Sequence, residues 1–397
     1  MKTSTEVQLD NARIVDVVTG STRAGNVRIS CGSIVDVDAA AAPSHVEVID
    51  LRGGYLLPGL INCHTHLQGQ YPYSLRQADE HPGRTALRAA WRARRLLSAG
   101  ITTVRSVHEQ ARVDIVVREA AKSGWTRAPR ILAGGRGLTV PGGHAAGLGS
   151  AIAAGPEAFR SAAREEFAAG ADHVKVFLTG GLANPGEEIG RPALTLAELS
   201  AVVQAAQERD SYVVAHAGGP DAIQLGLRAG VRSFEHGYHL DDETVTAMAE
   251  AGAFLTPTLT VTNSPDWQRR MGFDEAAIAR GEAAREEHMA SARRAIRAGV
   301  TIVAGTDFPG EERAADVPLI VRELQLLVEA GLPAAAAIRA ATTTAATLLG
   351  LADQIGQVTA GFRADLIAVA EDPTESARAC ADVRLVMQAG ELVSSTR

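Results

Sequence analysis

The stretch that decides the fold is a short apolar run that ends in two histidines, Pro58-Gly-Leu-Ile-Asn-Cys-His-Thr-His66. Seven further apolar runs follow it along the chain, and longer segments with helical spacing separate them. The eight runs cover residues 60–64, 101–106, 130–134, 173–178, 212–216, 233–236, 254–259 and 301–305. Short strands that alternate with helices are typical of repeated βα units around a parallel sheet.

Helical spacing of apolar residues is found between these runs. It covers residues 85–98, 156–169, 195–209, 241–251 and 274–298. Eight βα repeats between Gly59 and Gly350 agree in number and length with a (β/α)8 TIM barrel. The predicted fold class is therefore α/β, with an open doubly wound sheet as the structural alternative.

The two ends of the chain have a different sequence pattern, in which turn residues separate short strand-like runs. The runs cover residues 8–18, 26–30, 33–38 and 46–51 near the start, and 365–370, 383–387 and 391–395 near the end. We expect both ends to pair into one small β-sandwich domain. The predicted domains are residues 1–57 plus 358–397 for this β domain, and 58–357 for the hydrolase barrel.

Composition excludes several classes of protein. The 397 residues include 39 Lys and Arg against 46 Asp and Glu, which gives a net charge of −7 and argues against a nucleic-acid partner. Cys31, Cys63 and Cys380 are too few and too scattered for a disulfide framework or a CxxC metal site. The amino-terminal residues lack an apolar signal segment, and no run is long enough to span a membrane. We therefore expect a cytoplasmic protein without a membrane partner.

Polar residues inside the apolar runs are the informative exceptions, because strands of a parallel barrel are covered on both faces. They are His64, His66, Lys175, His216, His236 and Asp307. All except Lys175 lie at or just after the carboxyl end of a run, where barrel enzymes build their active sites.

Four imidazoles and one carboxylate suit a divalent transition metal, above all zinc. His64 and His66 are two residues apart, so along a strand both side chains point to the same side. Lys175 does not fit as a cation, because a buried ammonium would repel the metal. Carboxylation of its amine would give an anionic carbamate that can bridge two metals. Taken singly, each histidine could be a hydrogen-bonded structural residue, Lys175 could reach solvent, and Asp307 could belong to a turn.

These residues together resemble the motifs of the amidohydrolase superfamily over nearly the whole chain. The first run is similar to its HxH motif, and residues 100–105 to its second strand. Within the superfamily the chain resembles the prolidase-like subgroup of Xaa-dipeptidases, N-acyl amino acid amidases and ochratoxinase-like amidases. This likeness rests on residues 141–144, 174–181, 215–218, 234–243 and 304–307, with carboxyl-terminal signatures at 340–346 and 361–366.

The resemblance implies two divalent metal ions, most simply zinc. His64, His66 and Asp307 would hold the buried ion, His216 and His236 the outer one, and carboxylated Lys175 would bridge them. A hydroxide shared by both metals would be the nucleophile, with Asp307 as general base.

Four residues are candidates for contact with the small-molecule substrate. The resemblance implies that His144, on the loop after the third strand, reaches a carbonyl oxygen or a carboxylate of the substrate. Tyr238, His239 and Arg105 could contact substrate as well, although Arg105 could equally pair with a structural carboxylate. The roles of His108 and of the glycine-rich loop 179–192, a candidate mobile lid, stay open.

The predicted function is metal-dependent hydrolysis of an amide bond in a small dipeptide or N-acyl amino acid. A cyclic amide, carbamate or ester substrate, an imidazolone or nucleobase aminohydrolase, and a non-catalytic relative are the alternatives. Lys175 argues against the aminohydrolases, as does the segment Ala-Gly-Gly-Pro after His216, where those enzymes usually carry a Glu. The alanine-rich segment 333–349 could pack on the barrel or form the interface of a homo-oligomer.

Overall fold

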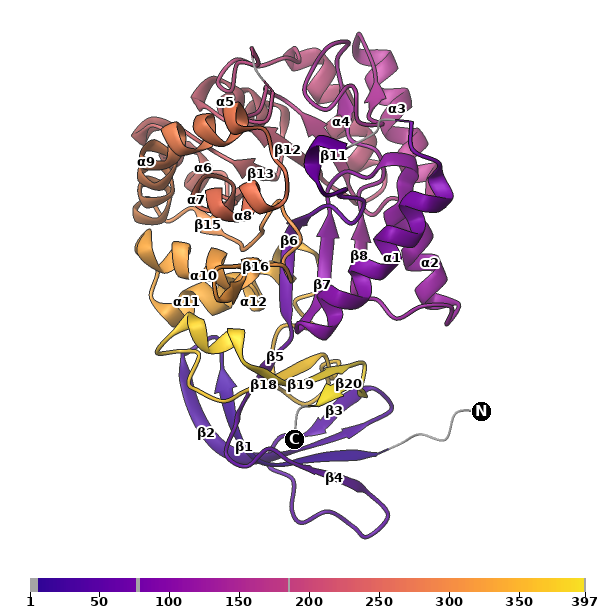
Figure 1. The fold of residues 1–397 in the computed structure, drawn as a ribbon, viewed down its shortest axis with the longest axis vertical. Helices are drawn as coiled ribbons and strands as arrows, with labels where there is room; N and C mark the ends of the chain where they lie inside the picture. The colour runs from indigo at the N-terminus through magenta and orange to yellow at the C-terminus, as the bar shows by residue number, and fades with distance from the viewer. Residues whose placement is uncertain (1–5, 76–78, 185, 396–397) are drawn as a thin grey trace.

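The computed structural model describes residues 6–75, 79–184 and 186–395. A large unit of strands and helices carries a smaller β unit at one end (Figure 1). Each of the eight predicted runs contains a parallel strand. These strands are β6 (Leu60–Thr65), β7 (Ile101–Ser106), β8 (Arg130–Ala133), β11 (Val174–Phe177), β12 (Val213–Ala217), β13 (Ser233–His236), β14 (Phe254–Thr256) and β15 (Thr301–Ile302).

The strands pair in chain order in two sheets. One has the order β6-β7-β8, and the other runs from β11 through β12, β13 and β14 to β15. The short strand β9 (Leu138–Thr139) lies beside β11, and β10 (Ala151–Ile152) lies beside β9. Backbone hydrogen bonds connect the sheets, among them those from the Cys63 amide to the Ala304 carbonyl (2.9 Å) and from the Asp172 amide to the Ala133 carbonyl (2.7 Å). The carboxyl ends of all eight strands therefore meet on one side, as in a (β/α)8 barrel.

The five predicted helices are present with shifts of a few residues at their ends. They are α1 (Pro82–Ser98), α3 (Pro156–Ala169), α4 (Leu196–Gln207), α6 (Asp242–Glu250) and α9 (Glu275–Arg297). Helix α4 begins at a capping box, in which the side chains of Thr195 and Glu198 each bind the other residue's backbone amide. Among the described helices outside the predicted ranges, the longer ones are α2 (Val113–Lys122), α5 (Pro220–Ala229) and α10 (Leu319–Glu329).

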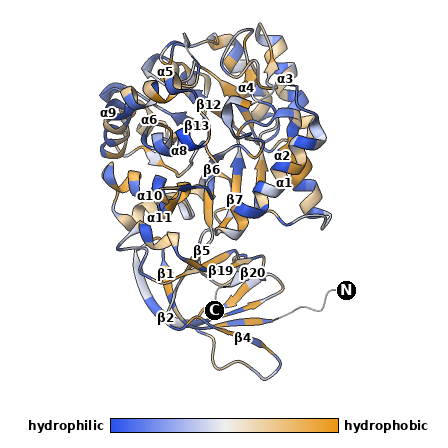
Figure 2. Cartoon of the chain, viewed as in Figure 1, coloured by the Kyte–Doolittle hydropathy of each residue, from blue (hydrophilic) through white to orange (hydrophobic). Residues whose placement is uncertain are grey.

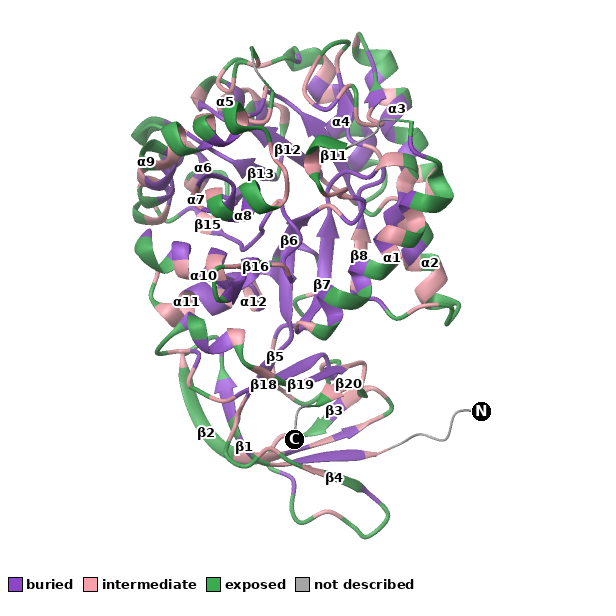
Figure 3. Cartoon of the chain, in the orientation of Figure 1, coloured by how far each residue is buried: buried purple, intermediate pink, exposed green. Residues whose placement is uncertain are grey.

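The core lies between the strands and the surrounding helices. Figure 2 shows apolar residues along many of the strands, and Figure 3 shows most of these strands buried. The alanine-rich segment forms α11 (Ala334–Ala340) and α12 (Thr343–Leu348), whose buried residues include Ala337, Ile338 and Ala346. These buried side chains pack on the large unit within the same chain, while a role of this segment in a homo-oligomer stays a prediction.

Both chain ends build the smaller unit. Its strands are β1 (Val7–Asp16), β2 (Ser21–Ser30), β3 (Ser33–Asp36), β4 (Glu47–Asp50), β5 (Tyr55–Pro58), β18 (Leu366–Val369), β19 (Val383–Gln388) and β20 (Glu391–Ser395). They form one continuous sheet in the order β20-β19-β18-β5-β1-β2-β3, with β4 on β1. The sheet has a core of its own around Leu9, Ile29 and Leu366. Strands from the two ends meet where β5 and β18 pair, while the sandwich and the domain boundaries stay predictions.

Membrane spans were sought in the described part of the chain, and none of its helices combines the length and the apolar character that crossing a bilayer requires.

Candidate active site

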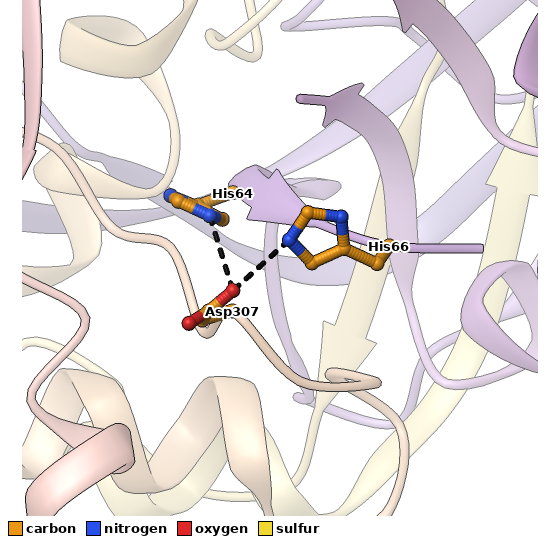
Figure 4. A group of neighbouring side chains, drawn as sticks. All are labelled: His64, His66 and Asp307. Atoms are coloured by element: carbon orange, nitrogen blue, oxygen red, sulfur yellow. Dashed lines mark hydrogen bonds and ion pairs between the residues drawn. The ribbon is translucent and has the colours of Figure 1, made fainter. Parts of the chain in front are cut away.

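Three predicted ligands converge at the carboxyl ends of β6 and β15. Oδ1 of Asp307 lies 3.1 Å from Nε2 of His64 and 3.0 Å from Nε2 of His66 (Figure 4). One donor atom from each of the three residues lies within 4.8 Å of the others. The close approach depends on Gly305, because a Cβ atom there would lie 2.7 Å from Cβ of His64. Two imidazoles and a carboxylate at this spacing can hold a divalent cation.

The second ring nitrogen of each of these histidines is bound to the protein. Nδ1 of His64 donates to Oε2 of Glu235 (2.5 Å), and Nδ1 of His66 donates to the backbone carbonyl of His108 (2.9 Å). Such contacts fix the tautomer and leave the lone pair of Nε2 for a metal. The orientation of both rings is therefore set by the protein itself.

His216 and His236 lie beside the first three residues. Their ring centroids are 4.4 Å apart, and the ring of His236 is 5.1 Å from that of His64. Nε2 of His216 donates to the carbonyl of Gly180 (3.0 Å), and Nδ1 of His236 shares a hydrogen bond with the hydroxyl of Thr258 (2.7 Å). Burial lowers the pKa of both rings well below the usual value, so each is neutral and has one free nitrogen.

Lys175 is the sixth predicted ligand. It is only 1% exposed, and its Nζ has no hydrogen-bond partner within the residues that the structure describes. Burial lowers the pKa of this amine to about 8, although Glu235 and Asp307 oppose the change. An amine left without a partner among metal ligands fits conversion to a carbamate, because the carbamate is an anionic oxygen donor.

Asp307 and His236 have unusual backbone conformations. Their φ angles are 60° and 72°, in the left-handed region that residues with a side chain seldom adopt. Each such residue costs on the order of 1–3 kcal/mol, and such residues cluster at functional sites. Burial alone would raise the pKa of Asp307, but the nearby His64 and His66 hold it well below its usual range. Asp307 is therefore a carboxylate at neutral pH.

The six predicted ligands line one cavity, together with two of the predicted substrate contacts, His144 and Tyr238. The ring of His144 stacks on that of His216 with centroids 4.5 Å apart, and the ring of Tyr238 stacks on that of His236 at 5.2 Å. The two side chains therefore flank the histidine pair.

Arg105 has a different role from the substrate contact that the sequence suggests. Its side chain is fully buried and does not line the cavity. Its guanidinium donates to the carbonyl of Cys63 (2.6 Å), to Oγ of Ser233 (3.0 Å) and to Oε1 of Glu235 (2.7 Å). The assignment of Arg105 to the substrate is thus corrected, because pairing with a structural carboxylate is what the structure shows.

Two other histidines near the cavity also make structural contacts. His239 packs against the backbone of Gly190 and Gly219 and is not among the described residues that line the cavity. Nδ1 of His108 accepts from the Gly137 amide (2.9 Å), and Nε2 donates to the Leu148 carbonyl (3.1 Å). Both ring nitrogens of His108 therefore bind backbone groups of neighbouring loops, while the residue also belongs to the lining of the cavity.

Glu235 is the important residue that the sequence analysis leaves without a role. It is fully buried in β13 and contacts both His64 and Arg105. The signal that could have found it is the same one that singles out Lys175, a charge inside an apolar run.

The α/β fold and these convergent polar groups define a hydrolase. The profile of the Amidohydrolase family matches residues 55–393, and the chain belongs to this family. Its relatives establish that it is a hydrolase acting on carbon–nitrogen bonds. The predicted resemblance is confirmed.

Known relatives cover most of the chain. Ochratoxinase from Aspergillus niger is 30% identical over 353 residues, which are 81% of this chain and 71% of the relative. Imidazolonepropionase from Anaeromyxobacter dehalogenans is 28% identical over 376 residues, covering 84% of this chain and 79% of that protein. The crystal structure of a Xaa-Pro dipeptidase with bound methionine in the active site has a TM-score of 0.89 at 28% identity, covering 98% of this chain and 99% of that one.

Proposed function

We propose that this protein is a metal-dependent amidase that cleaves the amide bond of a dipeptide or an N-acyl amino acid. The observation that carries the proposal is the convergence of His64, His66 and Asp307 beside a neutral histidine pair and an unpartnered buried lysine. The names of the relatives, ochratoxinase and Xaa-Pro dipeptidase, support cleavage of an amide bond.

The donor set favours two divalent ions, with zinc as the best fit. His64, His66 and Asp307 would hold one ion, His216 and His236 the other, and Lys175, once carboxylated, would be shared between them. Such ions, when bound, would polarise the carbonyl group of the substrate and make a water molecule acidic enough to attack at neutral pH.

Asp307 would handle the proton. Its Oδ1 faces both imidazoles, so Oδ2 would accept the proton of the attacking water and deliver it to the leaving nitrogen. His144 and Tyr238, on either side of the histidine pair, would bind the carbonyl oxygen or the carboxylate of the substrate. Oriented polar groups of this kind stabilise charge that develops in the transition state.

An aromatic wall of the cavity supports a substrate with an apolar substituent. It consists of Tyr71, Tyr73, Phe273 and Phe308, and the rings of Tyr73 and Phe273 stack with centroids 4.2 Å apart. The only charged side chains among the described lining residues are Lys175 and Asp307. We therefore infer that an uncharged, preferably aromatic group of the amide occupies this side.

The test is a mass-spectrometric hydrolysis screen of the zinc-loaded protein against pooled dipeptides, N-acyl amino acids and aryl carbamates. We expect amide cleavage by the parent protein and by Lys122→Ala, a surface control, and none by Lys175→Ala. Cleavage of carbamates or esters alone would replace the proposed substrate class. Cleavage of imidazolones or nucleobases in a second pool, with silence in the first, would favour the aminohydrolase alternative.

A further inference from the structure

The loop 179–192 carries two neighbouring glutamates with different surroundings. Glu188 is exposed, whereas the side chain of Glu187 turns inward and is 18% exposed. Oε2 of Glu187 accepts a hydrogen bond from Nδ1 of His144 at 2.6 Å. The carboxylate thus contacts a cavity residue that the loop 141–149 contributes from elsewhere in the chain.

The same carboxylate also closes the loop on itself. Oε2 accepts from the Gly181 amide (2.8 Å), and Oε1 accepts from Nδ2 of Asn184 (2.6 Å). Burial alone would raise the pKa of Glu187, but the contacts with His144, Asn184 and the Gly181 amide together outweigh this effect and lower the pKa to about 2. Glu187 is therefore an ionised acceptor with every oxygen engaged.

Two glycines bring the loop into direct contact with the site. A Cβ atom at Gly181 would lie 2.4 Å from Cε1 of His144, so a side chain at this position would displace the ring. The carbonyl of the preceding Gly180 holds Nε2 of His216. Consequently one turn of the loop touches both members of the stacked pair His144 and His216.

Helix α9 fixes the loop from its other side. Nε of Arg280 donates to the carbonyl of Leu182 (2.9 Å), and Nη2 donates to that of Ala183 (3.0 Å). Leu182 and Ala183 both line the cavity, so these contacts bind helix α9 to the part of the loop that faces the site.

We propose that Glu187 is a positioning residue, which binds Nδ1 of His144 and thereby presents Nε2 of that ring to the substrate. The inference rests on the proposed function only in giving His144 a substrate to bind. An imidazole on a loop has two ring orientations, and a carboxylate at one nitrogen selects one of them. Glu187 would act through His144 alone and would not touch the metal ions or the substrate.

A double-mutant cycle tests this directly. We expect Glu187→Gln to lower kcat by about 10- to 100-fold at unchanged zinc content, and the matched loop variant Glu188→Gln to stay within about twofold of the parent. In a His144→Ala background, Glu187→Gln should cause no further loss beyond about twofold, because the two residues act as one unit. An equal effect of Glu187→Gln with and without His144, or parent-like activity, would overturn the proposal.

A second measurement does not depend on activity. Long-range proton–nitrogen NMR of histidine-labelled protein reports the ring nitrogens, and His144→Ala identifies the signal of this residue. Glu187→Gln should shift that signal and Glu188→Gln should leave it in place. If the shift occurs but the parent cleaves no amide, the pair stands and the proposed function fails. If amides are cleaved but no shift occurs, the positioning role fails.

Discussion

Nδ1 of His64 lies 2.5 Å from Oε2 of Glu235, so an imidazole of the candidate metal site is bound directly to a buried carboxylate. The other oxygen of Glu235 is 2.7 Å from the guanidinium of Arg105. Arg105 and His64 hold the pKa of this carboxyl well below its usual range despite burial. The orientation of a candidate ligand thus depends on a buried ion pair that solvent does not reach.

Glu235→Gln should therefore weaken metal binding. The amide cannot accept the proton of His64 as strongly, and we expect a loss of about 10- to 100-fold in zinc affinity. It also leaves Arg105 buried without a counter-charge, which costs about 3–5 kcal/mol of unfolding free energy. Chelator competition and urea unfolding measure the two effects separately. Parent-like affinity in Glu235→Gln, against the exposed control Glu243→Gln, would contradict this role.

Carboxylation of Lys175 can be detected without any substrate. The chain has only three lysines, Lys2, Lys122 and Lys175, which simplifies assignment. With ¹³C-bicarbonate and zinc, we expect a carbamate signal in the NMR spectra of the parent and of Lys122→Ala, and none for Lys175→Ala. A carbamate signal that survives in Lys175→Ala would rule out the predicted bridge.

His144→Ala should separate substrate binding from metal binding. His144 is not a candidate ligand itself and contacts the candidate ligand His216 by ring stacking, so the variant should hold as much zinc as the parent. Loss of an oriented polar group should lower kcat by about 100-fold or more. Elemental analysis of the variant checks the first part, and steady-state kinetics the second. Zinc loss would show that His144 belongs to the metal site instead.

Phe273→Ala should change substrate preference. Its ring stacks on that of Tyr73 at the aromatic wall, and such contacts contribute about 0.5–1.5 kcal/mol. We expect KM to rise up to about tenfold for N-benzoyl amino acids and to change little for N-acetyl analogues. The surface variant Trp125→Ala is the control, since that side chain is 84% exposed. Equal changes for both substrates would argue against an aromatic subsite.

Ionisation of the Glu311 carboxyl should contribute to the pH dependence of the unfolding free energy. Its buried carboxyl oxygens have no hydrogen-bond partner in the described structure, and burial raises the pKa from 4.5 to about 7. Because the folded-state pKa is the higher one, this group stabilises the fold fully below about pH 4.5, and the contribution is lost as the pH rises through about 7.

Urea unfolding at about pH 5 and about pH 8 measures this component. The decrease in unfolding free energy with pH should be smaller in Glu311→Gln than in the parent. Glu312→Gln, next to it and paired with Arg95, should keep most of the decrease, because burial is the main cause of the raised pKa of Glu311 and the charge of Glu312 a lesser one. If the unfolding free energy of Glu311→Gln falls with pH as steeply as that of the parent, ionisation of Glu311 does not contribute to the pH dependence.

The strands could be predicted from the sequence because each is an apolar run between turn residues. The histidine pair at residues 64 and 66 could be predicted because a spacing of two puts both side chains on one side of a strand. The role of Arg105 could not be predicted in this way. A charge at a strand end gives the same signal for a ligand and for an ion pair, and the partner Glu235 lies 130 residues further along.

The loop 179–192 shows the same limit. Its glycines and its Asn-Pro-Gly turn suggest mobility, whereas the contacts that hold it come from His144 and Arg280, both distant in the chain. Likewise β2 begins at Ser21, earlier than the apolar pattern indicates, because pairing with β1 extends it. Local composition is visible in a sequence, but partners brought together by folding are not.

The position of the β unit has a practical consequence for attaching the enzyme to a surface or to a fusion partner. The Gly59 amide donates to the carbonyl of Asp365 (2.8 Å), which ties this unit to the amino end of β6, while His64 and His66 lie toward its other end. The first and last strands, β1 and β20, both belong to the β unit (Figure 1). A linker joined to β1 or β20 would therefore start at the unit that lies away from the cavity, and substrate access would stay open.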